Sequence, residues 1–173
     1  DITPANNTLQ TEIYNGTNIQ NFSIKLPVYK NEPIIKFYPE GGNLIEAVPN
    51  TVGWEITNSE KEPMAVSAAL YKGDTLLQTI NTNIYGMGKF VFTPDSGKSY
   101  YVKLNIPAND SQYILPKVLQ SGTAITIANA LTTDTLFINA NDKGISNKLL
   151  LLVHDYKNVF VSATVVTNGK PVK

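Results

Sequence analysis

The acidic residue in the most unusual stretch of this sequence is Glu40, which lies between Pro39 and the glycine pair Gly41-Gly42. A carboxyl group at a sharp turn could serve as a general acid or a metal ligand. Retaining glycosidase chemistry, however, requires a second carboxyl group about 5 Å away, and nothing in the sequence pairs Glu40 with Glu46 or Glu55. A glutamate beside two glycines more often accepts hydrogen bonds from backbone N–H groups of its own turn. We therefore predict a structural role for Glu40.

His154 is the only histidine of the chain. A catalytic triad would need a nucleophile and an orienting acid around it, and Ser162 and Asp155 are near in sequence. Because successive residues of a strand point to opposite faces, Asp155 cannot easily orient His154. A zinc site would require further imidazoles. The pattern favours a strand-end histidine that is hydrogen-bonded to a neighbour.

A second group of polar residues, Asn139, Asn141 and Asp142, precedes Gly144 and is faintly similar to an oxygen-rich calcium loop. The EF-hand pattern requires a bidentate glutamate at a fixed distance, and none follows. We predict a hairpin turn over residues 141–144 and no bound metal.

Aromatic residues offer a possible platform for stacking against a sugar. Trp54, however, alternates with polar residues between Val52 and Ile56, which predicts that it packs in a core. Tyr101 is expected on the outward face of its strand and is the candidate ligand contact. The other tyrosines considered with it are Tyr71, Tyr85 and Tyr100.

The composition excludes several classes of function. Lys+Arg and Asp+Glu are 14 each, and every basic residue is a lysine, so the chain lacks the basic stripe and the arginines that bind nucleic acid. The absence of cysteine excludes thiolate catalysis, disulfides and cysteine-bound metals. The longest apolar run, residues 149–153, is far shorter than the roughly 20 residues that span a bilayer. We expect no enzyme activity, no cofactor, no nucleic-acid partner and no transmembrane segment.

The elements that would position these residues are all strands. Strands at Leu9–Tyr14 and Asn18–Leu26 flank Asn15-Gly16, which is a strong hairpin signal. We assign residues 1–32 to an extension that carries this hairpin, as a linker or the remnant of a preceding domain.

About seven short strands follow in residues 33–108. The Pro39–Gly42 turn joins Ile34–Phe37 to a strand centred on Trp54, and Gly86 and Gly88 surround Met87 before another strand. Turn signals recur about every 8–12 residues, and no helical periodicity appears, which is typical of an antiparallel sandwich. A second, smaller series occupies residues 109–173 and includes Leu149–His154, which we expect to be buried on both faces. The fold class predicted is all-β, with two consecutive immunoglobulin-like sandwich domains.

Several of these stretches resemble the macroglobulin-type β-sandwich domains of large bacterial cell-envelope proteins of the Bacteroidetes type. The stretches are Phe37–Ile45, Val52–Trp54, Gly86–Phe90, Phe92–Pro94 and Tyr100–Tyr101. Such proteins are similar to alpha-macroglobulins, and many carry a region like the plug of TonB-dependent receptors elsewhere. The thioester of protease-trapping macroglobulins needs a cysteine, which this chain lacks.

The resemblance implies tandem sandwich domains in a protein exported to the periplasm, outer membrane or cell surface. Because the N-terminus does not look like a signal peptide, we expect a mature form or a fragment of a larger protein. The function expected is a non-catalytic structural or interaction module, and its partners are neighbouring domains of the parent protein. The alternative is a module that binds a glycan or another envelope protein in uptake or adhesion.

Overall fold

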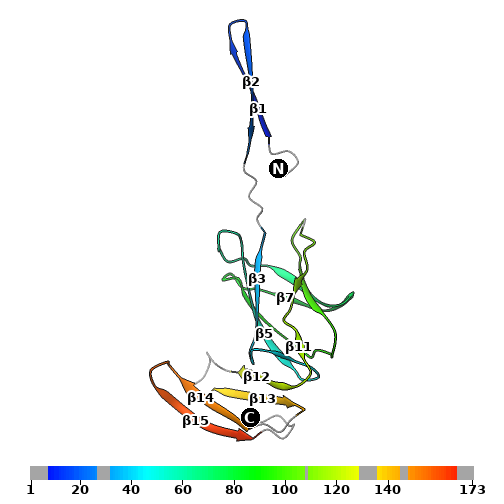
Figure 1. Ribbon diagram of the computed structural model, residues 1–173, viewed down its shortest axis with the longest axis vertical. Coiled ribbons are helices and arrows are strands. Elements are labelled where there is room, and N and C mark those ends of the chain that lie inside the picture. Colours follow the sequence, from blue (N-terminus) through cyan, green and yellow to red (C-terminus); the bar gives the residue numbers. More distant parts are fainter. Residues whose placement is uncertain (1–7, 27–31, 108, 129–135, 145–147, 167–173) are drawn as a thin grey trace. The chain divides into compact units, whose positions relative to one another are not determined.

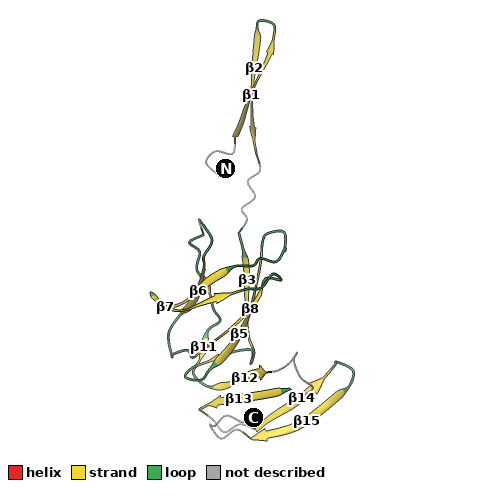
Figure 2. Cartoon of the chain, turned by 180° about the vertical axis from the view of Figure 1, so that it is seen from behind, coloured by secondary structure: helices red, strands yellow, loops and turns green. Residues whose placement is uncertain are grey.

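The computed structural model describes residues 8–26, 32–107, 109–128, 136–144 and 148–166, and every regular element within these ranges is a strand (Figure 2). The all-β prediction is therefore confirmed. The chain divides into two compact units, residues 1–32 and 33–173. None of the described residues forms a helix that is long and apolar enough to cross a membrane.

The first unit is the predicted hairpin. Its strands, β1 (Thr8–Asn15) and β2 (Asn18–Lys25), pair along their full length. Gly16 takes a φ of 63° at the first of the two loop positions, as a type II′ turn requires. Cross-strand partners share a face, so Leu9 and Ile24 lie together on one side. The hairpin is thus amphipathic, with its apolar side chains exposed.

Two antiparallel sheets form the first part of the second unit (Figure 1). One sheet has the order β3-β5-β8 and the other has the order β10-β9-β6-β7. Their bounds are β3 Ile34–Pro39, β5 Asn50–Thr57, β6 Ser67–Lys72, β7 Thr75–Asn81, β8 Met87–Phe92, β9 Tyr100–Leu104 and β10 Tyr113–Ile114.

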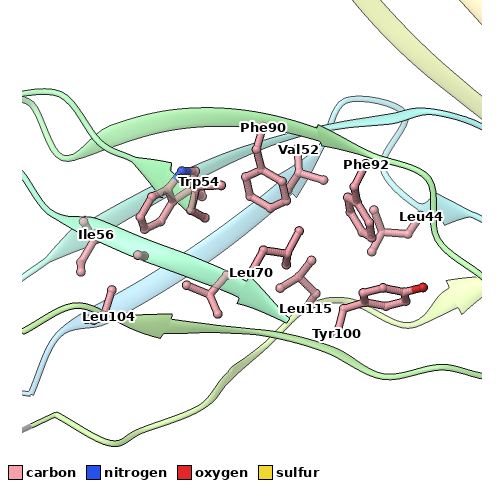
Figure 3. Packing of buried hydrophobic residues seen from close by; sticks show 13 residues of the cluster. Leu44, Val52, Trp54, Ile56, Leu70, Phe90, Phe92, Tyr100, Leu104 and Leu115 are labelled. Atoms are coloured by element: carbon pink, nitrogen blue, oxygen red, sulfur yellow. The ribbon is translucent and has the colours of Figure 1, made fainter. Parts of the chain in front are cut away.

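A single hydrophobic core lies between these two sheets (Figure 3). Val52, Trp54 and Ile56 of β5 are buried, whereas the residues between them are only half-buried, so the predicted alternation is confirmed. From the opposite sheet, Leu70 and Leu104 point into the same cluster. Two sheets that share one core make a β-sandwich arrangement.

The sandwich extends beyond the boundary expected after residue 108. Tyr113–Ile114 pairs with β9, and Leu115 is buried in the core. The short strand β11 (Val118–Leu119) then pairs in parallel with β4 (Leu44–Ile45). Residues 113–119, which we assigned to the second domain, therefore pair and pack with the first sandwich. Leu115 is buried in the core and Tyr113 and Val118 pack against it, whereas Ile114 and Leu119 are 62% and 37% exposed.

Two further hairpins follow: β12 (Gly122–Ala128) with β13 (Phe137–Lys143), and β14 (Lys148–His154) with β15 (Val159–Val166). The turn predicted over residues 141–144 is wrong in its position, because Asn141–Lys143 pairs with β12 and the strand ends only at Lys143. Strand β14 is not buried on both faces either. Leu150 and Leu152 are 64% and 47% exposed, since the strand belongs to a sheet of only two strands.

Gly86 and Gly88 are used for close packing of the backbone. A Cβ atom on Gly88 would lie 2.3 Å from the carbonyl oxygen of Asn81 and 2.4 Å from Nε1 of Trp54. Gly86 has a φ of 68° and equally little room, with the carbonyl oxygen of Ile56 at 2.4 Å. Gly86 therefore lets the loop before β8 approach the end of β5, and Gly88 lets β8 itself lie against Trp54.

We predict that Gly88→Ala destabilises the sandwich, because the added methyl group meets a fixed carbonyl oxygen and the buried indole. The free energy of unfolding in urea should fall by about 3 kcal/mol. The matched control is Lys89→Ala, at an exposed neighbouring position of the same strand, which should change it by less than about 0.5 kcal/mol. Equal effects of the two substitutions would contradict this account.

Candidate functional site

The Pro39–Gly42 turn is held by its own backbone and by β5. The N–H of Gly42 donates to the carbonyl oxygen of Pro39 at 2.8 Å, and the N–H of Glu40 donates to the carbonyl oxygen of Thr51 at 2.9 Å. Gly42 has a φ of 79°, a conformation that glycine adopts without steric cost. The turn thus fixes the direction of the Glu40 side chain.

Glu40 accepts a hydrogen bond from outside its own turn. Its Oε2 lies 2.8 Å from the backbone nitrogen of Ile127, a residue of β12. We expected Glu40 to accept a hydrogen bond from a backbone N–H, and it does. The donor, however, belongs to β12 and not to the turn itself. The sequence carries no signal for the partner, because 87 positions separate the two residues.

Gly41 brings the backbone of the turn against the backbone of the same strand. A Cβ atom on Gly41 would lie 2.9 Å from the nitrogen of Ile125 and 3.0 Å from the carbonyl oxygen of Thr123. Any side chain at this position would therefore push the two segments apart. Gly41 is required here for space, whereas Gly42 is required for its positive φ.

Further polar contacts continue along the same contact zone. The hydroxyl groups of Thr51 and Thr126 lie 3.2 Å apart, and Glu46 forms an ion pair with Lys143 of β13. We use the name turn–strand junction for Glu40, Gly41, Glu46 and Thr51 together with their partners on β12 and β13, the residues Thr123, Ile125, Thr126, Ile127 and Lys143.

Asn50 holds the sandwich side of this junction in shape. Its side chain is buried and bonds to both backbone groups of Ile45: Oδ1 accepts from the N–H at 2.8 Å, and Nδ2 donates to the carbonyl oxygen at 2.7 Å. A further bond joins Nδ2 to the carbonyl oxygen of Val48. The role of Asn50 depends on contacts with Ile45 and Val48 that are made only in the folded loop.

The ion pair between Glu46 and Lys143 lowers the pKa of Glu46. The Glu46 side chain is only 15% exposed, and the ammonium group of Lys143 lowers the pKa of its carboxyl group below the ordinary value of 4.5. A lowered pKa means that the folded state favours the charged carboxylate. The pair therefore adds to stability where Glu46 is ionised.

His154 is exposed at the end of β14, where its Nδ1 accepts a hydrogen bond from the N–H of Tyr156 at 3.0 Å. This is the satisfied strand-end histidine that we predicted. The carboxylate of Asp155 accepts from the N–H groups of Lys157 and Asn158 in the same turn, and these bonds lower the pKa of Asp155.

The predicted aromatic platform differs from the structure at Tyr101. Trp54 is 2% exposed and lies in the core, as expected. Tyr101, however, is only 8% exposed, because its ring stacks on Tyr71 at 5.3 Å and Lys103 lies over both rings. Tyr101 therefore faces outward from the core, as expected, but it is not the exposed ligand contact that we predicted. Strand alternation does place it outside the core, but its neighbours on the outer face of the sheet cover it.

A hollow of about 360 Å³ lies between the two C-terminal hairpins. Its lining is almost entirely apolar and includes Ile125, Ile138 and Leu151, and it contains no titratable side chain. No group of three or more acidic or histidine side chains within the described ranges is arranged to hold a metal ion. The chemistry offered by this hollow is apolar contact.

Comparison with known proteins gave no match: no family model, no curated protein and no solved structure is significantly similar to this chain.

We predict that Gly41→Ala loosens the turn–strand junction, because the new methyl group would overlap the backbone of β12. The free energy of unfolding should fall by about 1–3 kcal/mol, and the amide of Ile127 should exchange with solvent faster than in the wild type. Gly42→Ala is the matched control. It meets no neighbour within 4 Å, so its cost of about 1–2 kcal/mol comes from the positive φ alone. The amide of Ile127 should exchange at the wild-type rate in Gly42→Ala. Faster exchange of this amide in Gly42→Ala than in Gly41→Ala would contradict our assignment.

We predict that the benefit of Glu46 depends on pH. Because the folded state lowers its pKa, the ion pair stabilises the protein above the ordinary pKa of 4.5 and loses this effect as the pH falls through the folded-state value. Thermal unfolding of the wild type and Glu46→Gln should therefore differ most at neutral pH and converge in acid. Lys143→Met removes the same pair and should show the same trend. A difference that stays constant with pH would contradict it.

Proposed function

We propose that this chain is a non-catalytic structural module in which the sandwich carries the β12–β13 hairpin in a fixed orientation. One observation supports this most directly. The carboxylate of Glu40 binds the Ile127 N–H at 2.8 Å, while Gly41 leaves no space for a side chain against the same strand. The Pro39–Gly42 turn thus joins the sandwich to strand β12.

The other contacts of the junction are of the same kind. They combine one ion pair, one hydroxyl contact and backbone packing, and they are distributed along β12 and β13. Contacts of this type resist rotation about the connecting segment, whereas a single flexible link would allow domain motion. A role in spacing and orienting consecutive domains follows from such rigidity.

For the fold, we propose two consecutive immunoglobulin-like sandwich domains of the macroglobulin type. The first is supported by seven strands in two sheets around one core. The second is supported by the two C-terminal hairpins, whose facing apolar sides enclose the hollow. The family assignment rests on the resemblance of the Phe37–Ile45 and Gly86–Phe90 stretches.

We further propose that the module belongs to a larger exported protein of the bacterial cell envelope, with neighbouring domains as its partners. This setting rests on the same resemblance, and the absence of cysteine is compatible with an oxidising compartment. The alternative function, binding of another protein, is favoured by the exposed apolar side chains of β14 and β15, such as Leu150 and Phe160. Glycan binding loses its main support because Tyr101 is buried.

Amide relaxation measured by NMR tests the proposed coupling role. If the sandwich and the β12–β13 hairpin form one rigid body, the amides of β5, β6, β12 and β13 should report the same rotational correlation time. In the Gly41→Ala variant, β12 and β13 should become more mobile while β6 is unchanged. Independent tumbling of the hairpin in the wild type would contradict the proposal.

A further inference from the structure

Strand β15 has the composition of an unprotected sheet edge. Its eight residues, Val159–Val166, include four valines and contain no charged residue and no proline. Natural proteins protect open strand edges with lysine, proline, bulges or a covering segment. Strand β15 has a register irregularity near its start, where His154 pairs with Val159 and Val153 with Val161, and its pairing is regular from Val161 to Val166. A long, uncharged strand that is rich in β-branched residues is suited to pairing with another strand.

Among the described residues, no strand covers the second edge of β15. The strand pairs with β14 in a two-stranded sheet, and no other strand of the described ranges pairs with it. Figures 1 and 2 both show β15 on the outer side of β14. The backbone groups that point away from β14 can therefore accept an incoming strand.

Strand β12 is a second uncharged strand, and its edge is covered by other residues of the chain. Strand β12 also lacks charge, but the side chain of Glu40 occupies its Ile127 N–H and Gly41 packs on its backbone. The remaining strands of the long two-stranded sheets carry charge: Glu12 in β1, Lys25 in β2, Lys143 in β13 and Lys148 in β14. Strand β15 is therefore the exception among the described strands of this group.

We propose that β15 pairs antiparallel with β15 of a second copy of this chain, so that the two hairpins form one four-stranded sheet. In a two-fold contact the same patch faces itself, so every charge on the patch would face its own copy. A strand without charge avoids this repulsion, and this property favours a second copy as the partner. The inference is independent of the proposed coupling role.

The side-chain faces also suit this arrangement. A two-fold axis perpendicular to the sheet keeps each face continuous and brings the middle of the strand, Ser162 and Ala163, beside its own copy. Phe160 and Val166 are 65% and 55% exposed. Pairing would cover part of both side chains with the partner strand.

The small size of the contact favours a reversible dimer. A strand of eight residues is about 27 Å long, and one strand pair buries less than the roughly 1,600 Å² of a standard stable interface. The dimer should therefore be in equilibrium with the monomer at micromolar concentrations. It should not be a permanent dimer.

Sedimentation equilibrium of the full chain over a range of concentrations tests the proposal, with charge placed at Ser162, which is exposed. Like charges on neighbouring strands oppose pairing, so Ser162→Lys and Ser162→Glu should each raise the dimer dissociation constant by roughly fivefold or more. An equimolar mixture of the two variants should restore association at least to the wild-type level. The control Ser23→Lys, on the polar face of β2, should dimerise like the wild type.

Thermal unfolding separates this effect from misfolding, because both Ser162 variants should melt like the wild type at concentrations where all are monomeric. Several results would overturn the proposal. They are a wild-type chain that stays monomeric throughout, a dimer that is insensitive to Ser162→Lys, and a mixture of the two variants that associates no better than either alone. The last result would show that β15 does not face its own copy.

Discussion

The contact between the sandwich and β12 depends on the close approach of two backbones at Gly41. The turn reaches β12 only because position 41 lacks a side chain, and the Glu40 carboxylate can then reach the Ile127 N–H. Thr51 and Glu46 contact β12 and β13 in the same zone. The polar contacts of the junction thus accompany the close backbone approach at Gly41.

The same logic applies inside the sandwich. Trp54 is the largest fully buried side chain, and it fits because Gly88 on the neighbouring strand leaves space for its indole ring. Cores are packed so closely that one added methylene is felt. Glycines in this chain therefore serve packing at positions 41 and 88 and backbone direction at position 42.

Sheet edges connect the coupling role with the association inferred for β15. An open edge presents unpaired backbone groups that other chains can pair with. In this chain the edge of β12 is occupied by Glu40 and Gly41, whereas β15 keeps an uncharged edge without a partner strand among the described residues. The two strands are similar in composition, so their surroundings make the difference.

The sequence by itself determined the features that depend on neighbouring residues: the strands, the N-terminal hairpin, the inward side of β5 with Trp54, and the bonded state of His154. These follow from side-chain alternation and turn chemistry, which act over a few residues. Only the tertiary structure decided that Glu40 binds Ile127, that Tyr71 covers Tyr101, that residues 113–119 complete the sandwich, and that Asn141–Lys143 continues a strand. Each of these depends on contacts between segments far apart in the chain, and no local pattern specifies which distant segments will meet.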